Sequence, residues 1–150
     1  MGKTVVIGVG NRLRGDDGVG CHLIDLLKET IPDIDAIDAS TVPENYIESI
    51  IKKTPERVLI IDACLFDGEP GEFRLFGTES LENLRLPNFS THTPPLNLIA
   101  QLINAATGAK IYLLGIQPFQ RGFGEKISPA LANALPSIVS YIQEWVLTQM

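Results

Sequence analysis

The sequence has few cysteines, no long apolar run and no excess of basic residues. Its 150 residues include only Cys21 and Cys64, too few for a disulfide framework. The longest apolar runs, Val5–Val9 and Val58–Ile61, are far shorter than the ~20 residues of a membrane-spanning helix. With 18 acidic against 12 basic residues, the net charge of −6 leaves no basic stripe for a phosphate backbone. We therefore expect a cytoplasmic protein with no nucleic-acid or membrane partner.

The apolar pattern alternates between short β-branched runs and helical periodicity. A chain of this length suits one domain, so residues 1–150 are expected to fold as a single unit. Buried strands are predicted at Thr4–Gly8, Ile34–Ala39, Arg57–Asp62 and Ile111–Gly115. Helices are predicted from Gly18 to Pro32, Pro43 to Lys53, Thr93 to Ala106 and from Ser128 onward, where Pro136 is expected to kink or split the last one.

One further segment, Glu72–Phe76, alternates polar and apolar residues, which favours an edge strand antiparallel to the others. Strands that alternate with helices indicate an α/β fold, a three-layer α/β/α sandwich around a mostly parallel sheet of about five strands. Such sheets bind ligands outside the carboxyl ends of their strands. Those ends are therefore the first place to look for chemistry.

Carboxylates follow two of the predicted strands. Asp16 and Asp17 stand between glycines after the first strand, and Asp62 ends the third. Neighbouring strands would bring these groups to one edge, and like charges crowded in a partly dry crevice bind a cation or share a proton. The alternative is structural: Asp16 or Asp17 caps the helix that begins at Gly18, and Asp62 closes a turn.

His92 adds a nitrogen ligand to this pattern. It lies just before a predicted helix, among hydroxyl residues able to fix its tautomer. An imidazole with two carboxylates suits a borderline divalent metal such as nickel or zinc. A nucleophilic pair of Cys64 with His92 is the alternative, but nothing nearby lowers the pKa of Cys64, which favours a small buried hydrophobe.

A different class of protein shares part of this pattern. Receiver-type signalling domains, which bind Mg²⁺ and phosphate, also carry acidic residues after the first strand and an aspartate ending the third. They need a lysine at the end of the last strand. Here Gln117 and Pro118 occupy that place, and Lys110 lies at the other end.

Six short motifs together resemble the hydrogenase maturation endopeptidases. They occur in order over nearly the whole chain: Gly8-x-Gly10-Asn11, Gly15-Asp16-Asp17-Gly18, Pro43-Glu44-Asn45, Leu59-Ile60-Ile61-Asp62-Ala63, Thr91-His92-Thr93 and Leu114-Gly115-Ile116-Gln117-Pro118. The last two look most like the branch that serves formate hydrogenlyase and related energy-converting hydrogenases. The resemblance implies an enzyme that removes a short C-terminal extension from the large-subunit precursor of a [NiFe] hydrogenase after nickel insertion.

The resemblance also implies roles for particular residues. The family's three nickel-contacting positions fall on Asp16, Asp62 and His92, and Asp38 matches a further acidic position of functional interest. The nickel belongs to the substrate, so no permanently bound cofactor is expected. A carboxylate such as Asp16 or Asp38 is a candidate general base, which makes the expected catalytic set Asp16, Asp38, Asp62 and His92.

The segment Gln117–Gly124 lies beside the same edge. Its Phe119, Arg121 and Phe123 are predicted either to grip the precursor's C-terminal region or, for the two phenylalanines, to pack beneath the loop.

Overall fold

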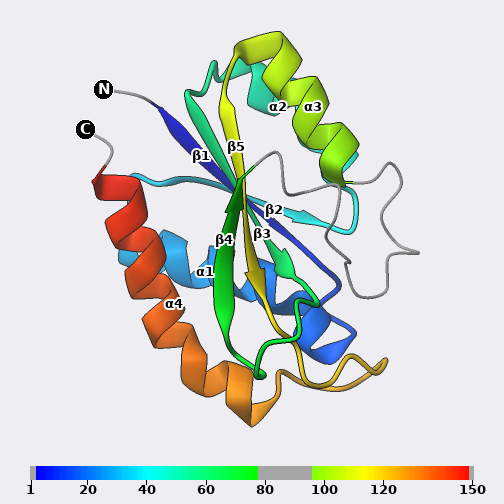
Figure 1. Cartoon of the computed structure of the whole chain (residues 1–150). Helices are drawn as coiled ribbons and strands as arrows, with labels where there is room; N and C mark the ends of the chain where they lie inside the picture. The colour runs from blue at the N-terminus through cyan, green and yellow to red at the C-terminus, as the bar shows by residue number, and fades with distance from the viewer. Residues whose placement is uncertain (1–2, 78–95, 149–150) are drawn as a thin grey trace.

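Five strands form one sheet in the order β2-β1-β3-β5-β4 (Figure 1). The computed structural model describes residues 3–77 and 96–148. The strands are β1 (Thr4–Val9), β2 (Asp35–Ser40), β3 (Arg57–Ala63), β4 (Phe73–Gly77) and β5 (Lys110–Ile116). The helices are α1 (Val19–Thr30), α2 (Ile47–Lys52), α3 (Leu96–Thr107) and α4 (Pro129–Leu147), with 3-10 turns η1 (Gly15–Gly18) and η2 (Pro43–Tyr46).

The strand register aligns the carboxyl ends of the central strands. β1 pairs in parallel with β2 and with β3, so that Gly8 lies opposite both Asp38 and Ile61. β3 pairs in parallel with β5, which places Asp62 opposite Gly115. β4 is the one antiparallel strand among the described residues and pairs with β5 at the edge, which confirms that prediction.

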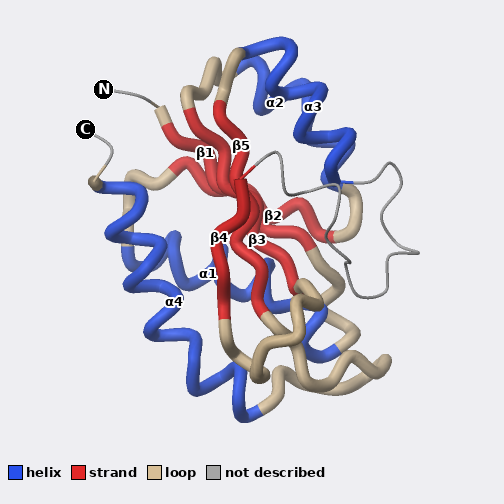
Figure 2. Tube along the Cα trace, viewed as in Figure 1, coloured by secondary structure: helices blue, strands red, loops and turns tan. Residues whose placement is uncertain are grey.

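Helices cover both faces of the sheet, and the strand sequences explain why. Alternate side chains of β3 point to opposite faces, so Val58 and Ile60 join the core under α2 and α3, whereas Leu59 and Ile61 join the core under α1 and α4. Figure 2 shows the sheet between these two helical layers. The predicted α/β/α sandwich is therefore confirmed.

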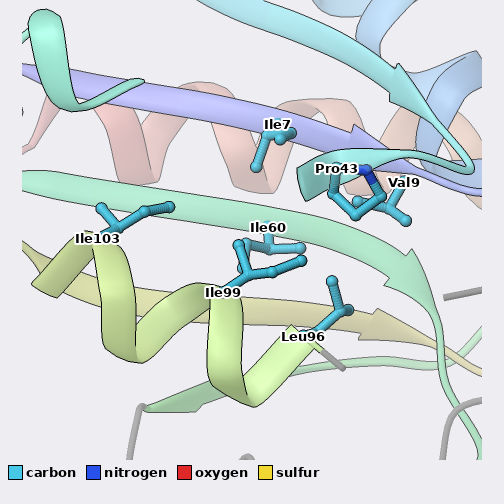
Figure 3. Close-up of a pocket in the computed structure, with 7 residues that line it drawn as sticks. All are labelled: Ile7, Val9, Pro43, Ile60, Leu96, Ile99 and Ile103. Atoms are coloured by element: carbon cyan, nitrogen blue, oxygen red, sulfur yellow. The ribbon is translucent and has the colours of Figure 1, made fainter. Parts of the chain in front are cut away.

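The core under α3 reaches the carboxyl end of the sheet. Leu96, Ile99 and Ile103 recur at helical spacing and face Ile60 of β3 (Figure 3). The gap between them is lined by apolar side chains and has no room for a water molecule. Pro43 of η2 borders the same gap, so α3 begins against the end of the sheet that carries Asp62.

The first turn of α1 lies directly on the strand ends. A Cβ atom on Gly20 would collide with the carbonyl oxygens of Val9 and Ile61, so only glycine permits this approach. Gly10 has a φ of +151°, and a Cβ there would collide with the carbonyl oxygen of Asp17. These two glycines hold η1, and with it Asp16 and Asp17, against the ends of β1 and β3.

Two helical predictions need correction. Of the two outcomes predicted at Pro136, the split is wrong, because α4 runs unbroken from Pro129 to Leu147, whereas the kink stays a prediction. Pro136 and Ala132 are both exposed, so water can solvate the Ala132 carbonyl that proline leaves without an N–H partner. The predicted Pro43–Lys53 helix begins as the 3-10 turn η2 before α2. The predicted helix start at Thr93 lies outside the described residues.

Candidate active site

Asp62 lies at the carboxyl end of β3 and is 1% exposed. Being two residues from Ile60, it shares the sheet face that α3 covers. Its Oδ1 accepts a hydrogen bond from the N–H of Ala63 at 2.8 Å. Burial, together with the negative charge of Asp17, raises the pKa of Asp62 well above its ordinary value.

The Asp16 carboxylate faces a loop that comes from the other end of the chain. Oδ1 accepts the N–H of Ser128 at 2.7 Å, and Oδ2 accepts the N–H groups of Phe119 and Gln120 at 2.8 and 3.0 Å. The N–H of Asp16 donates to the carbonyl of Gln120 at 2.7 Å. Asp16 therefore fastens the segment after β5 to η1, and its oxygens are committed to backbone donors.

The neighbouring carboxylate, Asp17, is not fully hydrogen-bonded within the described residues. It is 1% exposed, and its Oδ2 has no hydrogen-bond partner in the described part of the chain. Burial raises the pKa of Asp17 to about 6, although the Asn11 backbone and the charges of Arg121 and Arg14 pull it down. The charge of Asp17 acts on Asp62.

Both aspartates are candidates by their place after β1, but the resemblance implied a nickel-contacting role for Asp16 and none for Asp17. Consecutive side chains of a 3-10 turn point about 120° apart, because three residues complete one turn. Asp16 and Asp17 both belong to η1, so one of them can face the loop while the other faces the strand ends. The Gly-Asp-Asp-Gly segment shows two adjacent acidic residues, but the sequence does not indicate which one faces the loop and which one faces the strand ends.

Asp38 is held in a separate network at the end of β2. Its Oδ2 accepts a hydrogen bond from Arg12 at 2.7 Å and its Oδ1 accepts one from the Ser40 N–H at 3.0 Å. Partial burial would raise the pKa of Asp38, but hydrogen bonds from Arg12, Cys21 and Ser40 outweigh it and lower the pKa. A carboxylate so stabilised in its charged form is a weak base.

Asp38 and Asp62 belong to strands that are not neighbours in the sheet. β1 separates their strands, and Ala36, which shares a face with Asp38, packs under α1 rather than α3. Arg12 extends this network to Asp25 of α1 at 2.9 Å. The geometry gives Asp38 the task of positioning the loop that carries Arg12, whereas its predicted role as a catalytic base stays a prediction.

His92 lies outside the described residues, so its predicted approach to the carboxylates stays a prediction. Within residues 3–77 and 96–148, no group of three or more histidine, cysteine or acidic side chains is arranged to hold a metal ion. The two described acidic groups that interact at the site are Asp17 and Asp62. Two carboxylates with raised pKa values can share a proton or accept a divalent cation.

Cys64 is buried two residues after Asp62. Burial and the charge of Asp62 raise the pKa of Cys64 to about 12, so it is a thiol rather than a nucleophilic thiolate at neutral pH. Its Cβ is close to the backbone of Gly115, where an added Cβ would be 2.8 Å away. This environment favours the packing role over the nucleophilic one.

Gln117, just after β5, takes the place where a receiver domain needs its lysine. Its Oε1 accepts N–H bonds from Phe66 at 2.9 Å and Gly68 at 3.1 Å, so it fixes the chain after β3. Lys110 begins β5 at the opposite edge of the sheet. The site therefore has no cation placed by β5 to hold a phosphoryl group.

Comparison with known proteins decides between these classes. A family model described as hydrogenase maturation protease matches residues 21–145. This chain belongs to the hydrogenase maturation protease family. Hydrogenase 3 maturation protease of Escherichia coli K12 is 31% identical over 142 residues, which cover 94% of this chain and 89% of that protein. The receiver-domain alternative is thereby excluded.

Solved structures of this family have the same fold. The [NiFe] hydrogenase maturation protease HycI from Thermococcus kodakarensis superposes with a TM-score of 0.82 at 32% identity, covering 96% of this chain and 92% of that one. The endopeptidase HycI from Escherichia coli gives a TM-score of 0.81 at 30% identity, covering 95% and 90%. The protein is accordingly a hydrogenase maturation protease, a peptidase. No helix among its described residues is long and apolar enough to cross a membrane.

Proposed function

We propose that this protease removes the C-terminal extension of a [NiFe] hydrogenase large-subunit precursor once nickel has been inserted. Family membership supports the substrate class. The observation that carries the nickel step is the interacting pair Asp17 and Asp62, two buried carboxylates whose pKa values are raised. A divalent cation brought by the substrate would relieve the repulsion between the two carboxylates. The nickel-loaded precursor would therefore bind more tightly than the nickel-free precursor.

Asp17, Asp62 and His92 are the ligands we propose for the substrate's nickel. Asp17 replaces Asp16 in this set because the Asp16 oxygens already accept three backbone N–H groups. The nickel ion arrives with the precursor, and no permanently bound cofactor is part of the proposal. We assign the reaction to the cytoplasm, where Cys21 and Cys64, both buried thiols, suit a reducing compartment.

In the reaction, nickel held by these residues polarises the scissile carbonyl or acidifies the attacking water. The alternative is that nickel only docks the precursor and a carboxylate takes the proton from water. Asp17 fits that second task better than Asp38, because a base with a pKa of about 6 stays ionised at neutral pH and still accepts a proton.

The test is to incubate the purified protein with nickel-loaded and nickel-free precursor in parallel. We expect a gel shift and a new C-terminal mass only with the loaded precursor. Equal cleavage of the nickel-free precursor would overturn nickel recognition but leave the peptidase activity standing. No cleavage of either precursor would overturn the proposed substrate.

A further inference from the structure

A group of exposed apolar and basic side chains adjoins the candidate site. Leu13 and Arg14 come from the loop after β1, and Phe119, Arg121 and Phe123 come from the loop after β5; we call these five residues the rim. Leu13, Phe119 and Phe123 are 60%, 67% and 72% exposed. The exposure of both phenylalanines rules out the alternative in which they pack beneath their loop. Neighbouring large apolar side chains this exposed mark a binding surface more often than a random surface.

The rim is held in place by hydrogen bonds. The Gly124 N–H donates to the Leu13 carbonyl at 2.6 Å, and the Gly15 N–H donates to the Glu125 carbonyl at 3.0 Å. The Asp16 carboxylate fastens the same loop at Phe119, Gln120 and Ser128. A partner that meets these phenylalanines therefore does not have to order the loop backbone first, which lowers the entropic cost of binding.

The rim carries two basic side chains. Arg14 and Arg121 line a hollow together with Phe119, and the Arg14 guanidinium lies 5.8 Å from the Phe123 ring centroid. Neither arginine forms an ion pair within the described residues. On a chain with a net charge of −6, two unpaired cations beside exposed aromatic rings are complementary to an acidic and apolar partner.

The rim is also continuous with the candidate site. The charges of Arg14 and Arg121 both act on the Asp17 carboxylate. Whatever binds the rim therefore lies next to the place where the substrate's nickel is proposed to bind. A second copy of this chain seated there would cover that site, which makes the substrate the better occupant.

We infer that the rim docks the precursor segment beside the scissile bond, with a large apolar side chain against Phe119 and Phe123 and an acidic side chain between Arg14 and Arg121. This inference rests on the proposed function and identifies the substrate feature that the protease reads besides nickel. Apolar contact supplies affinity, and the arginines supply direction and register.

Steady-state processing of nickel-loaded precursor tests the apolar part. We expect Phe119→Ser and Phe123→Ser each to raise KM about tenfold with little change in kcat or melting temperature. Leu147→Ser is the matched control, because Leu147 is 53% exposed near the end of α4 and lies outside the rim. An unchanged KM in both phenylalanine variants, with normal processing by the unmodified protein, overturns the inference and leaves the proposed function intact.

Salt dependence and competition test the charged part. In the unmodified protein KM should rise with ionic strength, and Arg14→Gln/Arg121→Gln should flatten that dependence, whereas Lys110→Gln should not. The amidated peptide acetyl-Glu-Leu-Phe-Glu should inhibit processing more strongly than acetyl-Lys-Leu-Phe-Lys. Equal inhibition by the two peptides, or an unaltered salt dependence in the arginine variant, overturns the acidic partner.

Size-exclusion chromatography tests the other possible occupant of the rim, a second copy of this chain. We expect the unmodified protein and the rim variants to elute at one position over a range of concentrations. A dimer that dissociates in Phe123→Ser would assign the rim to self-association and overturn docking of the precursor. Failure of the unmodified protein to process either precursor would instead overturn the proposed function, together with the inference that rests on it.

Discussion

Charged side chains are arranged differently at the two ends of the parallel strands, which we call the amino edge and the carboxyl edge of the sheet. At the amino edge, Lys3 and Lys53 flank Asp35 at 3.3 and 3.1 Å, so the carboxylate has two cations. Arg57, also at this edge, stacks on the Trp145 ring at 3.9 Å and donates to the Thr4 hydroxyl at 2.9 Å. Opposite charges and shared donors there tie the first strand residues to the end of α4.

At the carboxyl edge, Arg12 pairs with Asp38 at the end of β2, but like charges meet at the ends of β1 and β3. Asp17 and Asp62 are both buried, and each has a raised pKa. Asp16, adjacent in sequence to Asp17, has its carboxylate satisfied by backbone N–H groups. The difference indicates that charges are compensated at the amino edge, at Asp38 and at Asp16, whereas the like-charged pair lies where the chemistry is proposed.

The largest effect is expected from Asp62→Asn, which should lower processing of nickel-loaded precursor by at least about 100-fold. Asparagine keeps the shape of aspartate but lacks the negative charge that a divalent ion requires from an oxygen ligand. The metal-free protein should be as stable as before, or slightly more so, because one of two repelling charges is gone. Urea unfolding and processing assays measure the two effects, and normal processing would contradict the role assigned to Asp62.

The adjacent aspartates should separate stability from activity. Asp16→Asn is expected to lower the free energy of unfolding by about 2–4 kcal/mol, because an NH2 group would face backbone N–H donors that now bind a carboxylate. Asp17→Asn should leave the metal-free protein at least as stable at pH 7 and still reduce processing severely. The reverse pattern, with a stable but inactive Asp16→Asn and an active Asp17→Asn, would restore Asp16 as the ligand.

Asp16 and Asp17 also show which features could be predicted from the sequence and which could not. The apolar runs predicted the sheet and both helical layers because burial on two faces leaves a local signature in β1, β3 and β5. The direction of the Asp16 side chain has no such signature, because its partners lie 103 to 112 residues further along the chain. Only the tertiary fold decides which carboxylate of Gly-Asp-Asp-Gly meets backbone donors and which meets Asp62.

The exposure of the rim could not be predicted from the sequence either. From the sequence, Phe119 and Phe123 could equally well pack beneath their loop. They are exposed in the fold, where hydrogen bonds hold the loop backbone to the segment around η1. The tolerance of α4 for Pro136 depends on the solvent exposure of Ala132, another property of the assembled fold.

A dependence on pH should sharpen the contrast between the edges. The pKa of Asp17 is about 6 in the folded protein and near 4 when unfolded, so the folded state binds the proton more tightly. The resulting stabilisation is full below about pH 4 and is lost as pH rises through 6. Between pH 4 and 7 the free energy of unfolding should therefore fall by about 2–3 kcal/mol more in the unmodified protein than in Asp17→Asn. Parallel curves for the two proteins would show that Asp17 titrates normally.

The amino edge should give the converse result, a loss of stability without a loss of processing. Arg57→Gln removes the cation from the Trp145 ring and the bonds to Thr4 and the end of α4, which should cost about 1–2 kcal/mol. Processing at a temperature well below the melting point should stay within about twofold of normal. A large fall in kcat with the fold intact would mean that the amino edge contributes to the reaction as well as to stability.

The smallest effect is expected from Cys64→Ala, although Cys64 lies only two residues from Asp62. With a pKa of about 12 the thiol is protonated at neutral pH, so its removal should leave processing within about twofold of normal. Loss of a small buried side chain should cost about 1 kcal/mol of stability. Both quantities come from the assays used for Asp62→Asn, which serves as the inactive reference. If Cys64→Ala were as inactive as Asp62→Asn while still folded, the chemistry at this edge would depend on a thiol, and the paired carboxylates would hold the substrate without carrying out its cleavage.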